Sequence, residues 1–224
     1  MLIHQNLISD EEIQILRDYW KKNQDDVYIN GYLRDEIQDY RLDINDRDPE
    51  FDIIKKIVRT DFADYLRPNG DAKDGVFFWS ALQQAVIPHV LHIDDCFVDS
   101  RPAYTYIISF DTYDKHKTLA WKRICQDGNR ELHSLYEDWV KNYSSMPILS
   151  NSSELYDIDH TANKDGKYML DYFELDGGYS YVKGNGCVFN ARQMHCTSNW
   201  KKYNEFEYRE LLQIHVTIPD LIEL

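Results

Sequence analysis

The stretch RELLQIHVTI, residues 209–218, decides the fold class that we predict. Every second residue is apolar and the residues between them are mostly polar, which is typical of a β-strand that has one face against a hydrophobic core. The apolar face carries Leu212, Ile214, Val216 and Ile218. The opposite face carries Arg209, Leu211, Gln213 and His215. We therefore expect a strand that separates a core from a semi-polar cavity.

Short strand-like segments separated by turn residues fill the chain from residue 76 onward. They are residues 76–79, 82–92, 103–110, 118–121, 168–175, 179–182, 186–189 and 207–218. Such a series predicts an antiparallel sandwich or barrel, with helices covering one outer face. Residues 126–166 interrupt the series with one possible helix and a Ser/Asn/Asp-rich stretch. We interpret them as an insertion and as the best candidate for substrate selection.

Two amphipathic helices are predicted ahead of these strands. Ser9-Asp10-Glu11-Glu12 is a capping box, so the first helix should begin near Asp10. Asp48-Pro49 is a second start signal, and Pro68-Asn69-Gly70 should end the helix that follows. Residues 23–47 between the helices indicate loop with extended pieces. We expect a single domain over residues 1–224, with a helical flanking layer (1–70) and a mostly β core (76–218).

The stretch PHVLHIDD, residues 88–95, contains a candidate metal clamp. Residues i and i+2 of a strand point to the same side, so His92 and Asp94 would project together. His195 follows the apolar segment 186–189 and could supply a third ligand. Two imidazoles and one carboxylate form the facial triad that is typical of non-haem Fe(II) oxygenases. His89 and Asp95 have the wrong strand parity for this site.

The sequence order of these residues resembles the Fe(II)/2-oxoglutarate-dependent dioxygenase superfamily over roughly residues 76–218. The resemblance implies a double-stranded β-helix, a jelly-roll or cupin-like core, preceded by the two amphipathic helices. It implies that His92, Asp94 and His195 bind Fe(II), and that 2-oxoglutarate chelates the iron as cosubstrate. Arg209 would pair with the far carboxylate of 2-oxoglutarate, since a guanidinium can bind a carboxylate through two hydrogen bonds.

Three further side chains are candidate cosubstrate contacts. Tyr104 and Tyr106 share one face of the strand predicted after the His-x-Asp motif, and a phenol there could donate to the far carboxylate. Packing is the more common role of an aromatic residue in a strand. Thr197 should share the face of His195, two residues away, and could offer a hydroxyl group.

The chain departs from the superfamily pattern at two places. The gap between His195 and Arg209 is longer than the common spacing, so Lys201 or Lys202 is an alternative anchor for 2-oxoglutarate, although neither lies on a good strand. The glycine-rich lead into a strand after the His-x-Asp motif is replaced by Lys117-Thr118-Leu119-Ala120-Trp121. These departures leave the subfamily open.

Composition narrows the classes of partner. The net charge is −14 and basic residues form no long run, which disfavours attachment to duplex nucleic acid. The four cysteines lack Cys-x-x-Cys spacing, which favours reduced thiols and a cytoplasmic location. No apolar stretch reaches membrane length, so we expect no membrane association.

These observations favour an Fe(II)/2-oxoglutarate dioxygenase that hydroxylates a small molecule or a protein or peptide side chain. Conversion of 2-oxoglutarate to succinate would accompany the oxidation. One alternative is a cupin-like metalloenzyme that uses the triad without 2-oxoglutarate, and there Arg209 would bind substrate or stabilise the fold. Another is a non-catalytic β-sandwich binding module, in which the histidines are incidental.

Overall fold

The computed structural model describes residues 1–33, 36–87, 94, 102–113, 116–123, 148–149, 160–161, 173–191, 193, 195–197 and 207–219. Their strands form a seven-stranded and a three-stranded sheet. The larger sheet contains, in spatial order, β1 (Leu2–His4), β12 (Gly186–Asn190), β7 (Ala103–Ser109), β14 (Arg209–Thr217), β6 (Phe77–Ala85), β5 (Asp39–Asp43) and β2 (Tyr28–Ile29). The smaller sheet contains β11 (Phe173–Ser180), β8 (Lys117–Arg123) and β13 (His195–Thr197). Two short pairs join β3 (Tyr32–Leu33) to β4 (Glu36–Ile37) and β9 (Ile148–Leu149) to β10 (His160–Thr161).

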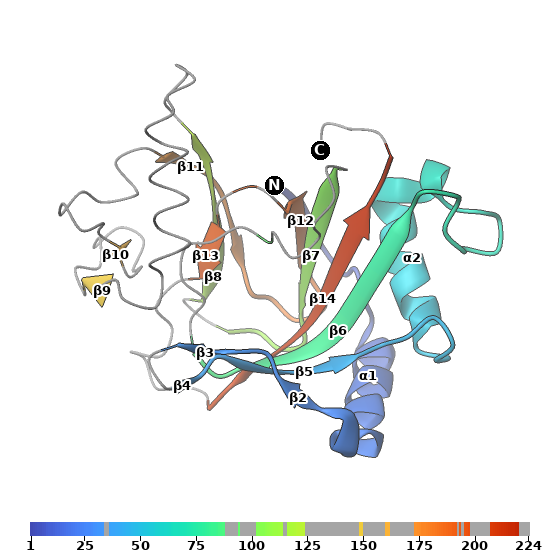
Figure 1. Cartoon of the computed structure of the whole chain (residues 1–224), viewed down its shortest axis with the longest axis horizontal. Coiled ribbons are helices and arrows are strands. Elements are labelled where there is room, and N and C mark those ends of the chain that lie inside the picture. The colour runs from blue at the N-terminus through green and yellow to red at the C-terminus, as the bar shows by residue number, and fades with distance from the viewer. Residues whose placement is uncertain are drawn as a thin grey trace.

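Successive strands cross between the two main sheets. Strands β6 and β7 lie in the larger sheet, β8 and β11 in the smaller, β12 in the larger, β13 in the smaller and β14 in the larger. Neighbouring strands pair antiparallel in both sheets. In Figure 1 the smaller sheet lies on one side of the larger sheet, and the helices lie on the other side. This crossing is a jelly-roll arrangement, so the prediction of a mostly β fold is confirmed.

Helix α1 (Asp10–Lys22) begins where the sequence predicts. Ser9 Oγ accepts the amide hydrogen of Glu12, and the Glu12 carboxylate accepts that of Ser9. Helix α2 (Phe51–Phe62) begins and ends inside the predicted limits. The Asp48 carboxylate accepts hydrogen bonds from the Asn45 amide and the Tyr19 hydroxyl instead of capping the helix. Short 3-10 helices follow at Gln24–Asp26 and Ala63–Tyr65.

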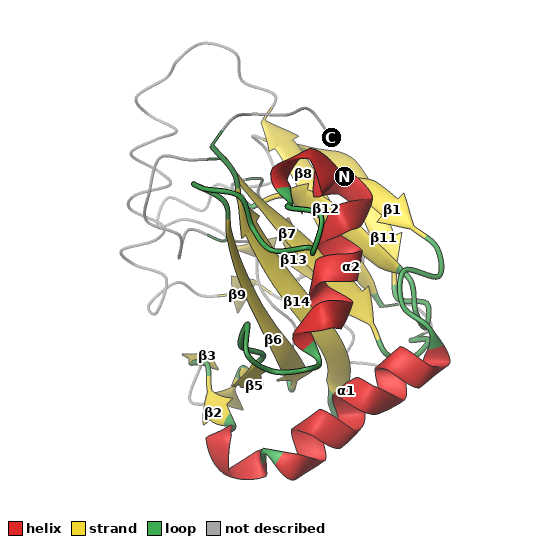
Figure 2. Cartoon of the chain, turned by 90° about the vertical axis from the view of Figure 1, so that its right-hand side faces the viewer, coloured by secondary structure: helices red, strands yellow, loops and turns green. Residues whose placement is uncertain are grey.

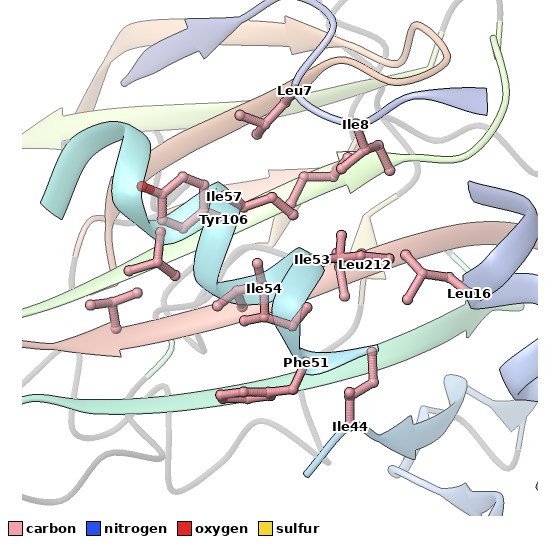
Figure 3. Close-up of a cluster of buried hydrophobic side chains, with 14 of the residues drawn as sticks. Leu7, Ile8, Leu16, Ile44, Phe51, Ile53, Ile54, Ile57, Tyr106 and Leu212 are labelled. Carbon is pink, nitrogen blue, oxygen red and sulfur yellow. The ribbon is translucent and has the colours of Figure 1, made fainter. Parts of the chain in front are cut away.

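The main hydrophobic core lies between these helices and the larger sheet. Figure 2 shows α2 lying across the outer face of that sheet, and Figure 3 shows the side chains that meet there. Leu16 of α1, Ile54 and Ile57 of α2, and Leu212 of β14 are completely buried. Burial of each such side chain stabilises the fold by about 1.5–3 kcal/mol. The helices therefore cover the apolar face of β14, and the other face of this strand borders the space between the two sheets.

Several predicted strand boundaries are wrong. Strand β5 continues the larger sheet beside β6, although its segment was expected to be mostly loop. Strand β6 is continuous across the break predicted at residues 80–81, and β11 continues across Gly177-Gly178 with an irregularity after Leu175. These strands were not predicted in full because β5 contains several polar residues and β11 contains two adjacent glycines, and neither feature is typical of a strand. The predicted helix of the insertion lies outside the described residues.

Candidate functional site

A pocket lies between the two sheets and is lined by side chains from both. It is bordered by Gln83, Arg209, Gln213, Thr118, His195 and Thr197. The alternation predicted for residues 209–218 is confirmed, because Arg209 and Gln213 face this pocket while Leu212 and Ile214 lie in the core. Thr197 faces the pocket together with His195, as its spacing indicates.

Asp94 and His195 lie together beside this pocket. His195 Nε2 is 3.5 Å from Asp94 Oδ2, and the two side chains are only 5% and 9% exposed. His195 Nδ1 lies 2.9 Å from the carbonyl oxygen of Gln193. A carbonyl oxygen can only accept, so this contact places a ring hydrogen on Nδ1, and Nε2 is the ring nitrogen that lies towards Asp94. The pair offers an imidazole nitrogen and a carboxylate oxygen, which are ligands that suit Fe(II).

Backbone contacts bring the two segments together. The amide of Asp94 donates to the carbonyl oxygen of Ala191 at 2.8 Å. Ala191 follows β12 directly and precedes His195 by four residues, and its own amide donates to Ala103 at the start of β7. Asp94 is therefore tied to the turn that leads into β13. The third predicted ligand, His92, lies outside the described residues, and the residues that are described contain no group of three potential ligands.

Arg209 is the most deeply buried cation of the pocket. Its side chain is fully buried, and its Cζ atom lies 4.7 Å from the centre of the Tyr181 ring. The ring face attracts a guanidinium, and the Tyr181 hydroxyl lies 2.5 Å from Thr118 Oγ1. Burial lowers the pKa of Arg209, but a guanidinium still remains charged at neutral pH. The pocket thus combines a fixed positive charge with hydroxyl groups at its wall, which suits a carboxylate.

His116 is a neighbour of this charge that the sequence did not indicate. Its ring is buried and stacks on Tyr113 with 5.5 Å between the ring centres. Burial and the charge of Arg209 lower the pKa of His116 to about 4. His116 is therefore neutral at pH 7 and adds no second positive charge beside Arg209.

The structure places Tyr104 and Tyr106 on the opposite side of the sheet from Arg209, which contradicts their predicted contact with a cosubstrate. Tyr106 pairs with Ile214 in register, so both side chains face the helices, as Figure 3 shows for Tyr106. The Tyr106 hydroxyl donates to Asp61 at 2.5 Å, and the Tyr104 ring packs 5.1 Å from that of Phe62. The two tyrosines belong to the core because strand register set their side.

Thr105, between those two tyrosines, is a second residue near the site that the sequence did not indicate. Its Oγ1 donates to Asp94 Oδ2 at 2.7 Å, and it also lies 3.0 Å from His215 Nδ1. His215, which was expected on the cavity face of its strand, is buried. The sequence carried no signal for Thr105, because its position opposite His215 of β14 follows from the pairing of the two strands.

Gln213 brings an unsatisfied group to the pocket. Its side chain is 7% exposed, and its buried Oε1 atom has no hydrogen-bond partner within the described part of the chain. A buried carbonyl oxygen without a donor costs about 1–3 kcal/mol. A bound molecule or water with a hydrogen to donate would remove this cost.

Searches with the sequence found no matching family model and no matching curated protein. Comparison with solved structures did find similar chains. SnoK, a non-haem α-ketoglutarate-dependent carbocyclase from nogalamycin biosynthesis, has a TM-score of 0.57 at 13% identity, over 98% of this chain and 79% of that one. The fold is that of the 2-oxoglutarate-dependent oxygenases.

Two further structures have the same fold. The epimerase SnoN, in a complex with Fe³⁺, α-ketoglutarate and nogalamycin RO, has a TM-score of 0.52 at 9% identity, over 97% of this chain and 78% of that one. EvdO2 from Micromonospora carbonacea var. aurantiaca has a TM-score of 0.50 at 13% identity, over 99% and 88% of the two chains. The resemblance inferred from His92, Asp94, His195 and Arg209 is thereby confirmed at the level of the fold. Of the helices in the described ranges, none is long and apolar enough to cross a membrane.

Proposed function

We propose that this protein is an Fe(II)/2-oxoglutarate-dependent oxygenase. The observation that carries the proposal is the meeting of Asp94 and His195, 3.5 Å apart, beside a pocket that also contains the buried Arg209. The similarity in fold to SnoK and SnoN supports the same assignment. A cupin-like enzyme without 2-oxoglutarate would give Arg209 no carboxylate cosubstrate to bind.

In this proposal His92, Asp94 and His195 hold Fe(II). Bound Fe(II) and 2-oxoglutarate would supply an oxygen-dependent oxidation of the substrate, with 2-oxoglutarate converted to succinate and carbon dioxide. Arg209 binds the far carboxylate of 2-oxoglutarate and so orients the molecule towards the metal ligands. Thr197 lines the same pocket, and its hydroxyl group can donate to that carboxylate. Tyr104 and Tyr106 have no part in this site.

The low exposure of the ligand pair also has a chemical role. His195 and Asp94 are held away from bulk water, which strengthens their attraction for a cation. The contact from His195 Nδ1 to a backbone carbonyl leaves Nε2 as the ring nitrogen that can bind the metal. The neutral His116 leaves Arg209 as the charge that selects an anionic cosubstrate.

We further propose hydroxylation of a small molecule or a peptide side chain as the outcome. Carbocyclase and epimerase activities are named for SnoK and SnoN, so this fold also supports other outcomes. We also propose one domain over residues 1–224, because α1 and α2 share a hydrophobic core with β7 and β14.

The test is conversion of 2-oxoglutarate to succinate in air, followed by proton NMR with Fe(II) and ascorbate present. We expect slow succinate formation by the wild type, even without substrate, and none by Asp94→Ala or His195→Ala. Asp61→Asn is the matched control, because Asp61 is a buried carboxylate that contacts Tyr106 and His4 on the other face of the sheet. A wild type that binds iron but forms no succinate would refute the proposal and favour the cupin-like enzyme.

A further inference from the structure

A row of side chains crosses the larger sheet and ends at Asp94. Trp79 of β6 lies directly opposite His215 of β14, and His215 lies directly opposite Thr105 of β7. Side chains at directly paired positions stand next to each other on the same face of a sheet. The Trp79 and His215 rings lie 5.1 Å apart, His215 Nδ1 lies 3.0 Å from Thr105 Oγ1, and Thr105 Oγ1 lies 2.7 Å from Asp94 Oδ2.

The direction of the hydrogen bonds in this row follows from the single hydrogen of a hydroxyl group. Thr105 donates that hydrogen to Asp94, because an ionised carboxylate can only accept. The hydroxyl oxygen must then accept from His215, which places a hydrogen on Nδ1. The row therefore runs from His215 through Thr105 to the carboxylate.

The row is also rigid. Thr105 is fully buried, and His215 is 1% exposed on the central strand β14, which pairs with strands on both sides. The oxygen that receives the hydrogen bond, Asp94 Oδ2, is the atom that lies 3.5 Å from His195 Nε2. Thr105 thus holds the carboxylate with that oxygen turned towards the second metal ligand.

We propose that Thr105 and His215 are positioning residues for the metal ligand Asp94. The inference rests on the proposed function, because it takes Asp94 as a ligand. Partners of this kind orient ligating groups, and their loss typically weakens metal binding by about 10- to 100-fold. Neither residue needs to touch the metal, 2-oxoglutarate or substrate.

The experiment is an anaerobic titration with Co(II) alone, followed by its visible absorption. Thr105→Val keeps the shape of the side chain and removes the hydroxyl, so we expect Co(II) affinity to fall about 10- to 100-fold and the Co(II) absorption band to change. Thr105→Ser keeps the hydroxyl group and loses only the methyl group, so its Co(II) affinity should lie within about threefold of that of the wild type. His215→Phe keeps a ring beside Trp79 and should weaken binding about tenfold.

Thr118→Val is the matched control, because Thr118 is also a fully buried threonine whose hydroxyl contacts another side chain, that of Tyr181. It should leave Co(II) affinity and the absorption band unchanged. Wild-type affinity in Thr105→Val would overturn this inference and leave the proposed function standing. If Thr105→Val does not fold, the comparison of Thr105→Ser with His215→Phe tests the inference instead. A loss of Co(II) affinity in the serine variant equal to that in His215→Phe would contradict a role for the hydroxyl group. A wild type that binds no Co(II) would overturn both the inference and the proposed function.

Discussion

Replacement of Arg209 by methionine should separate cosubstrate binding from stability. The guanidinium is fully buried, so its pairing with a carboxylate would be little screened by water. Loss of one partner from a buried charge pair costs about 3–5 kcal/mol. Since about 1.4 kcal/mol corresponds to tenfold in affinity, 2-oxoglutarate should bind about 100- to 4000-fold more weakly. The ligand-free variant should lose no stability, because an apolar side chain of similar volume often replaces a buried charge at no cost.

The assay is isothermal titration calorimetry with 2-oxoglutarate in the presence of Co(II), together with thermal unfolding of the ligand-free protein. Arg17→Met is the matched control. Arg17 binds Glu210, the neighbour of Arg209 on β14, and Asp111. Its replacement should lower stability and leave 2-oxoglutarate affinity unchanged. Wild-type affinity in Arg209→Met would refute the reasoning, most clearly if Lys201→Met or Lys202→Met weakened binding instead.

Three other predictions concern residues around the site. Tyr106→Phe should lower the free energy of unfolding by about 1–2 kcal/mol, through loss of the hydrogen bond to Asp61, and should leave 2-oxoglutarate affinity unchanged in calorimetry; a weaker affinity would restore Tyr106 to the site. Gln213→Leu should raise the unfolding free energy in urea by about 1 kcal/mol, because it removes a buried oxygen without a partner among the described residues, and a loss of stability would contradict this. His116→Phe should make the free energy of unfolding less sensitive to acid. In the wild type the pKa of His116 is about 4 in the folded state and about 6.5 in the unfolded chain, so the unfolded chain takes up the proton first. The stability of the wild type should therefore fall between about pH 6.5 and pH 4, and the variant should lack this part of the fall. Urea unfolding at pH 7 and pH 5 tests this, and an equal loss of stability in both proteins would count against it.

The sequence predicted those parts of the fold in which apolar and polar side chains follow a regular pattern. In β14 every second residue is apolar, so both its core face and its pocket face could be assigned. The capping box of α1 was equally clear, because its two hydrogen bonds are local in sequence. Strand β5 was missed because its polar residues are satisfied inside the fold: the buried Asp39 accepts hydrogen bonds from Arg41 and from Gln83 of β6, and a polar sequence does not disclose this.

Register explains the error at Tyr104 and Tyr106. Strand β7 carries apolar side chains on both faces, with Ile107 on one and Ile108 on the other, so its own sequence does not say which face is interior. The pairing of Tyr106 with Ile214, and of Thr105 with His215, decides this. A shift of one residue would exchange the two faces, and pairing register cannot be derived from one strand alone. Asp94, the proposed metal ligand, and Thr105 become neighbours only after the strands have paired.

The most direct test of the central claim is an anaerobic titration with Fe(II) and then 2-oxoglutarate, followed by visible absorption. We predict a weak charge-transfer band in the wild type, no band in His92→Ala or Asp94→Ala, and a weakened band in Arg209→Met at equal 2-oxoglutarate concentration. An unchanged band in Asp94→Ala, or no iron binding by the wild type, would contradict the account.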